Sequence, residues 1–129
     1  VPKRYLMKGD PYHCQCAKSS RLIRTALGMT PEQCRFSFQS RFGPEEWLKP
    51  YTDETVEGLA KSGVKRLAIV APGFTADCLE TLEELDGENR HIFEDNGGEH
   101  FTYVPALNAS PRGLTVLGEV VRRELMGWV

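Results

Sequence analysis

The stretch VKRLAIVAPGFTADCLETLEELDGE, residues 64–88, decides the fold. Its apolar run Leu67–Val70 has the length and β-branched content of a buried strand. Ala71-Pro72-Gly73 ends that strand, because proline cannot donate to a sheet ladder and glycine permits a sharp turn. A helical pattern follows, and either Thr75 or Asp77 can cap its free N–H groups. The stretch therefore predicts a strand, a tight turn and a helix.

Two stripes run along the predicted helix. Leu79, Leu82 and Leu85 lie at helical spacing and predict its core-facing side. Carboxylates at steps of three or four residues form the other stripe: Asp77, Glu80, Glu84 and Glu88. Spacing alone favours a solvated helix face. However, ligands of open α/β sheets bind outside the carboxyl ends of the strands, where this stripe begins, and carboxylates there can take protons or hold a hard divalent cation.

The rest of the chain predicts an α/β protein. Helices are expected over residues 12–27, 53–62, 75 or 77 to 95, and 111–126, and strands over 34–41, 67–70 and 101–106. Residues 1–11 read as a loop. The last helix has an expected core face: Leu114, Leu117, Val121 and Leu125. Alternating strands and helices predict a mostly parallel sheet flanked by helices, a three-layer Rossmann-like domain. Three strands are few for such a sheet, so we expect a further strand before the first residue.

Composition and charge exclude several classes of protein. The 129 residues suffice for one domain, and a net charge of -2 gives no reason to expect nucleic acid. No apolar run is long enough to cross a bilayer. Four cysteines are too few for a disulfide scaffold and favour a reduced intracellular protein. The sequence has neither a P-loop nor a G-x-G-x-x-G motif, so no nucleotide is expected.

Four stretches carry a family resemblance. They are GDPY (residues 9–12), FQSRFGPEEWLKPYTDET (38–55), GFTADCLETLEEL (73–85) and PALNASP (105–111). In this order they resemble the C-terminal half of bacterial ferrochelatases. That family comprises lyases that insert Fe(II) into protoporphyrin IX with release of two protons, the terminal step of haem biosynthesis.

The resemblance implies a two-domain enzyme that binds the porphyrin between two similar Rossmann-like domains. Residues 1–129 would be its C-terminal chelatase domain, and the N-terminal domain would lie outside this chain. The resemblance also implies a π-helical segment in the acidic helix. Glu80 falls on the family's catalytic acidic position, and Glu84 and Glu88 fall on the positions that continue the row. Together with Asp77 of the same stripe, they are the expected metal-binding residues.

Other candidate site residues are Trp47, Arg41 and three cysteines. Taken alone, Trp47 would more often be a core or interface anchor, but the resemblance puts it in the family's porphyrin-side loop, which two prolines bound here. Arg41 could pair with a porphyrin propionate, or be an ordinary surface base at a strand end. Some ferrochelatases carry a [2Fe–2S] cluster, for which Cys14, Cys16 and Cys34 could supply three ligands and the other domain a fourth. The favoured alternative is that Cys14 and Cys16 are simply thiols at a helix start, since C-x-C lacks the usual zinc spacing.

Two departures from the family pattern leave other functions open. The family's catalytic His would lie just before Val1, so this chain alone is expected to be inactive. Cys78 stands where some members have a His. The alternatives are a cobalt chelatase that acts on another tetrapyrrole, and a non-catalytic porphyrin- or metal-binding module. We expect a protein of the bacterial cytoplasm whose partners are protoporphyrin IX and the N-terminal domain. Peripheral contact with a membrane is left open.

Overall fold

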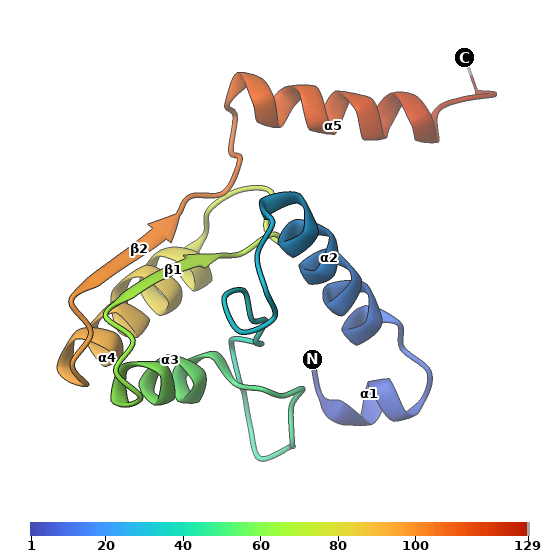
Figure 1. Cartoon of the computed structure of the whole chain (residues 1–129). Helices are drawn as coiled ribbons and strands as arrows, with labels where there is room; N and C mark the ends of the chain where they lie inside the picture. Colours follow the sequence, from blue (N-terminus) through green and yellow to red (C-terminus); the bar gives the residue numbers. More distant parts are fainter. Residues whose placement is uncertain (129) are drawn as a thin grey trace.

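The computed structural model describes residues 1–128 and has the expected mixture of helices and strands (Figure 1). The elements, in chain order, are α1 (Lys3–Met7), α2 (Tyr12–Leu27), α3 (Thr52–Lys61), β1 (Arg66–Val70), the π-helix η1 (Glu80–Glu88), α4 (Asn89–Asp95), β2 (His100–Val104) and α5 (Pro111–Glu124). The α/β class is confirmed, and so is the order of strand, turn and helix in residues 64–88. The helix begins later than predicted: η1 starts at Glu80 with Leu79 at its N-cap, and neither Thr75 nor Asp77 caps it. Residues 3–7 form a short helix where a loop was predicted.

The two strands pair in parallel, and η1 with α4 forms the crossover between them. In the register Leu67 lies opposite Phe101 and Ile69 opposite Tyr103, so these four side chains share one face of the sheet. The other face is exposed along both strands. The strand at 66–70 therefore alternates in burial and is not buried throughout, because the described helices pack on one face of the sheet only.

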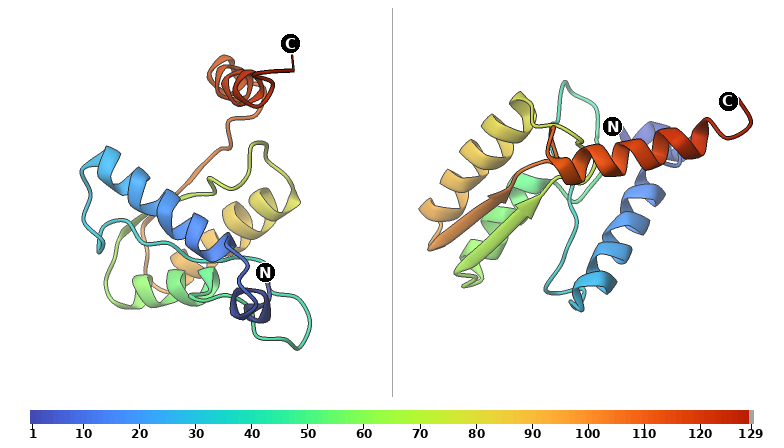
Figure 2. Two further views of the ribbon diagram at one scale, coloured as in Figure 1. Left: turned by 90° about the vertical axis from the view of Figure 1, so that its right-hand side faces the viewer. Right: turned by 90° about the horizontal axis from the view of Figure 1, so that it is seen from above.

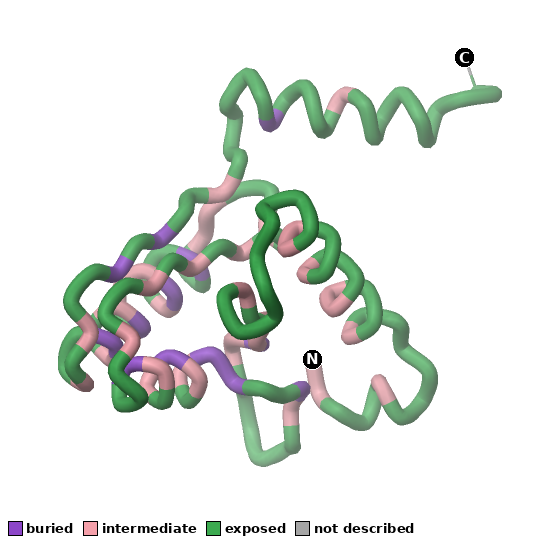
Figure 3. The backbone as a smooth tube through the Cα atoms, viewed as in Figure 1, coloured by how far each residue is buried: buried purple, intermediate pink, exposed green. Residues whose placement is uncertain are grey.

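The core lies between that inner face and the helices α3, η1 and α4 (Figure 3). Its buried members come from all these elements: Val56, Ala60, Leu85, Phe93, Phe101 and Tyr103. The rings of Phe93 and Phe101 are in contact at a tilt of 53°, with centroids 6.0 Å apart. Gly98 lies against the Phe93 ring so closely that a Cβ there would be 2.2 Å from it.

The strand predicted over residues 34–41 is absent. Phe38 makes one isolated parallel bridge to Tyr51, and its N–H donates to the Pro50 carbonyl at 2.8 Å. Pro50 has no backbone N–H to donate to the opposite segment, so the pairing does not extend past it. The Phe36 and Phe38 rings pack against each other and against His13 of α2 instead. The alternation of the two phenylalanines thus reflects packing against α2.

The last helix begins as predicted but lacks the expected core contacts. Ser110 caps α5 by accepting the Gly113 N–H at 3.1 Å, and Pro111 occupies the first turn. The face that was expected to be buried is 40–58% exposed: Leu114, Leu117, Val121 and Leu125. Figure 1 and the left view of Figure 2 show α5 standing away from the sheet. This apolar face has no partner within residues 1–128. No described helix is both long and apolar enough to span a membrane.

Candidate functional site

The π-helix η1 buries every fourth residue. Thr81, Leu85, Asn89 and Phe93 are all at most 2% exposed, along η1 and into α4. In a π-helix each carbonyl bonds to the N–H five residues on, so a turn is wider than 3.6 residues and side chains four apart come nearly into line. Leu79 and Leu82 consequently turn outward and are 74% and 50% exposed. The predicted apolar stripe was wrong for these two leucines, because it assumed α-helical turns.

The same register places three carboxylates along one side of η1. Glu80, Glu84 and Glu88 are four residues apart; Glu80 and Glu88 are exposed, and Glu84 is partly buried. We call these three residues the carboxylate row. Within residues 1–128, no three His, Cys, Asp or Glu side chains lie close enough together to hold a metal ion. The row is therefore a line of separate carboxylates and not a preformed cage.

Glu84 is held at both its side chain and its backbone. Its Oε1 accepts the Ser40 N–H at 2.5 Å, and its Oε2 accepts the Ser40 hydroxyl at 2.6 Å. Its carbonyl oxygen accepts the backbone N–H of Asn89 and, at 2.7 Å, the Asn89 side-chain amide. The neighbouring Gln39 amide donates to the Glu80 carbonyl at 3.1 Å. The segment at 39–40 thus lies directly against the start and middle of η1.

Asp77 lies in a hydrogen-bond network before η1. Its Oδ1 accepts from the Tyr103 hydroxyl (2.7 Å), the Thr81 hydroxyl (3.1 Å) and the Ala106 N–H (3.2 Å). Its Oδ2 accepts from the Asn108 amide at 2.8 Å, and Asn108 in turn accepts the Asp77 N–H. These donors, Asn108 and Tyr103 foremost, lower the pKa of Asp77 to about 2. The network ties the turn after β1 to the segment after β2, so both strands end at the same place.

Glu80 begins the row immediately after this network. The Cys78 thiol and the local backbone lower the pKa of the Glu80 carboxyl from its ordinary value. A lowered pKa keeps Glu80 ionised at neutral pH. An exposed, ionised carboxylate near the carboxyl end of a strand can accept a proton or bind a cation.

Trp47 and Arg41 belong to the loop that continues from Ser40, and both have partners within the chain. The Trp47 indole N–H donates to the Phe42 carbonyl at 2.9 Å, and the Trp47 backbone forms an isolated antiparallel β-bridge with Pro2. The Arg41 guanidinium pairs with two acidic side chains of α3 and lies 4.2 Å from the centre of the Tyr51 ring. Those two acids are Asp53 and Glu54.

The cysteines predicted as possible [2Fe–2S] ligands do not lie together in the structure. The thiols of Cys14, Cys16 and Cys34 are free, with Cys14 exposed and the other two partly buried. They form no group of metal-binding side chains within the described residues. The arrangement therefore does not fit an iron–sulfur site as it stands.

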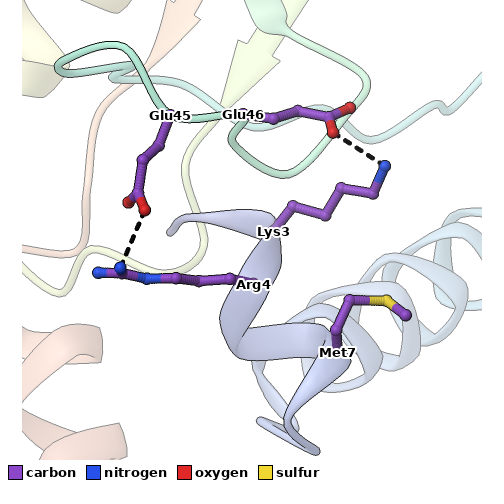
Figure 4. A pocket seen from close by; sticks show the side chains of 5 residues that line it. All are labelled: Lys3, Arg4, Met7, Glu45 and Glu46. Atoms are coloured by element: carbon purple, nitrogen blue, oxygen red, sulfur yellow. Dashed lines mark hydrogen bonds and ion pairs between the residues drawn. The ribbon is translucent and has the colours of Figure 1, made fainter.

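A shallow pocket of about 320 Å³ is lined by none of these residues (Figure 4). It is formed by α1 and the loop opposite, and is lined by Lys3, Arg4, Met7, Glu45 and Glu46. Exposed ion pairs join Lys3 to Glu46 at 3.0 Å and Arg4 to Glu45 at 2.9 Å. None of the predicted site residues contributes to this pocket, and ion pairs this exposed contribute little to stability.

Sequence reasoning missed Ser40, Asn89 and Asn108. The only available signal was for Asn108, because asparagine tolerates the left-handed backbone that it adopts with φ 51°. Ser40 and Asn89 act through contacts with Glu84, 44 and five residues away along the chain. No periodicity or motif in the sequence indicates such contacts.

Fold and site together define an α/β domain with a parallel sheet and a carboxylate-bearing π-helix after its first strand. The family model described as Ferrochelatase matches residues 1–125. Over all 129 residues the chain is 64% identical to a ferrochelatase of Allorhizobium ampelinum, 60% to one of Rhizobium meliloti and 56% to one of Brucella ovis. The chain belongs to the ferrochelatase family. It spans 38% of the length of the first two relatives and 37% of the third.

Proposed function

We propose that the full-length protein containing this chain inserts Fe(II) into protoporphyrin IX to give protohaem. The observation that carries the proposal is the carboxylate row on η1, in a chain that matches the ferrochelatase model over residues 1–125. The reaction exchanges one Fe(II) for two pyrrole N–H protons, so it needs exchangeable oxygen ligands and a proton acceptor at one place. Glu80, Glu84 and Glu88 supply both.

Exposure and position suggest different roles for the residues of the row. Iron is a substrate that must leave for four porphyrin nitrogens, so a tight site would trap it. Separate carboxylates, two of them exposed, bind a divalent cation weakly and exchange it fast. Glu80 stands first in the row, is exposed, and falls on the family's catalytic acidic position, so we assign it the proton transfers. In this proposal Asp77 positions the turn before Glu80, because both its oxygens already accept hydrogen bonds.

The porphyrin side is proposed to be the loop from Ser40 to Trp47. Its contact with Glu84 brings it beside the row, and its exposed aromatic side chain, Phe42, is 85% accessible. Arg41 would reach a propionate by exchanging its present acidic partners on α3. We include no [2Fe–2S] cluster, because the three cysteines do not come together in the described chain.

The last helix offers a surface that the proposed partner domain could bind. The apolar face of α5, centred on Leu117 and Val121, is exposed over its whole length, and contiguous exposed apolar surfaces of this kind mark interaction sites. We assign this face to the N-terminal domain of the same enzyme. The free thiols agree with a bacterial cytoplasmic location, which we propose for the enzyme. Any peripheral contact with a membrane would be made by the assembled enzyme.

The proposal is tested with Glu80→Gln in the full-length protein. Loss of the carboxylate should lower the rate of Fe(II) insertion into protoporphyrin IX by about 100-fold or more, the usual size of a general acid–base contribution. The matched control is Glu83→Gln, an exposed glutamate of η1 outside the row, which should stay within about twofold of wild type. If Glu80→Gln inserts iron at nearly the normal rate, the row is a solvated helix face and the proposed function is wrong.

A further inference from the structure

Ser40 is the only contact that fixes the Glu84 carboxylate within the described residues. Both its N–H and its hydroxyl donate to Glu84, one to each oxygen, at 2.5 and 2.6 Å. We propose that Ser40 is a positioning residue, which holds Glu84 apart from its neighbours so that the carboxylate row passes metal on and does not chelate it. This inference rests on the proposed function of the row.

The backbone of Ser40 shows that the contact is specific. Ser40 has φ 61°, in the left-handed region that non-glycine residues rarely adopt. Such a conformation persists only where the surroundings determine it, and it is common at ligand sites. Here it points the N–H and the side chain of one residue at the same carboxylate. A glycine would adopt this backbone more easily but would leave the second oxygen without its hydroxyl donor.

The two donors change what Glu84 can do for a cation. An ionised carboxylate has about four lone-pair positions, and Ser40 occupies one on each oxygen. The remaining positions can still meet a cation, but the side chain is not free to rotate toward Glu80 or Glu88. The Asn89 amide holds the carbonyl of Glu84 in the same way, so neither end of the residue can move. A fixed central carboxylate between two exposed ones favours transfer over capture.

Removal of the hydroxyl should therefore tighten metal binding. In Ser40→Ala, Glu84 is free to turn and bind one cation together with a neighbouring glutamate. A charge-assisted hydrogen bond of this kind is worth about a tenfold change in an equilibrium constant. We expect Mn(II) to bind about tenfold more tightly, and both KM for Fe(II) and kcat to fall. Ordinary damage to the loop would instead weaken Mn(II) binding and raise KM.

The experiment uses full-length protein and calorimetric titration with Mn(II), beside steady-state kinetics of Fe(II) insertion. Ser40→Ala and Ser40→Gly should both bind Mn(II) more tightly, since both lack the hydroxyl. Ser37→Ala is the matched control. Ser37 lies three residues before Ser40, and its hydroxyl is 2.9 Å from the Thr52 hydroxyl and contacts no carboxylate. This control should bind Mn(II) as wild type does.

A double mutant shows whether the effect passes through Glu84. In the Glu84→Ala background, Ser40→Ala should cause no further change in Mn(II) affinity. The inference is overturned if Ser40→Ala leaves Mn(II) binding unchanged or weaker, if Ser40→Gly behaves as wild type, or if the effect persists without Glu84. Its failure is distinct from failure of the proposed function, because Mn(II) affinity reports on Ser40 and Glu84 whereas turnover of Glu80→Gln reports on the reaction.

Discussion

The π-helical register of η1 makes a quantitative prediction for its two leucines, Leu82 and Leu85, and for Leu79 at its N-cap. Leu85 is 2% exposed, so Leu85→Ala loses a transfer free energy of about 1.5–3 kcal/mol and leaves a cavity among aromatic rings that cannot collapse fully. We expect a cost of about 3 kcal/mol. Leu82, at 50% exposure, should cost about 1 kcal/mol, and Leu79, at 74% exposure, about 0.5 kcal/mol.

The assay is thermal unfolding of the 129-residue chain followed by circular dichroism. For a domain of this size the Leu85→Ala cost corresponds to a fall in Tm of roughly 10 °C, whereas Leu79→Ala and Leu82→Ala should fall by a few degrees at most. An α-helical register would bury Leu82 and Leu85 together. Equal losses for Leu82→Ala and Leu85→Ala would therefore refute the wide-turn register and the alignment of the carboxylate row.

Two further predictions concern stability. Gly98→Ala should lower the free energy of unfolding by about 1–3 kcal/mol in urea titrations, because its Cβ would overlap the buried Phe93 ring. The control Gly58→Ala, at an open position inside α3, should raise the free energy of unfolding by about 0.5–1 kcal/mol. Equal effects of the two substitutions would contradict the packing at Gly98. The lowered pKa of Asp77 means that its ionised form stabilises the folded state above the ordinary value of 3.8, and that this stability is lost as pH falls toward about 2. The difference in urea midpoint between wild type and Asp77→Asn should therefore be constant above pH 4 and shrink between pH 4 and pH 2; a difference that is the same at pH 2 and pH 6 would count against the network around Asp77.

Local signals in the sequence predicted the parts of the fold that local interactions determine. The end of α2 at Gly28, with φ 65°, and the cap of α5 by Ser110 both follow from residue types at helix ends. The strand–turn–helix order of residues 66–88 follows from apolar content and from Pro72-Gly73. These features depend on contacts between residues close together in the chain.

The rest depends on distant contacts that no pattern shows. The prediction of a strand at 34–41 was wrong because its phenylalanines pack on His13 of α2. The prediction of a core face on α5 was wrong because no described element covers that face. The spacing of the carboxylates predicted that they lie on one side of a helix. Their alignment depends on the π-helix, which the family resemblance implied but which a period of 3.6 residues could not predict.

The wide turns of η1 also constrain the length of this segment more tightly than its composition. Many of its surface positions can change identity, because they face solvent. Removal of a single residue is different: each residue advances the chain by about 100° around an α-helix and by less in the wider π-helical turns, so its loss rotates everything that follows. Loss of Gly87, for example, would rotate Phe93 out of the core while Glu88 left the line of Glu80 and Glu84. Among homologous chains, substitutions should therefore accumulate along residues 80–88 while insertions and deletions are excluded.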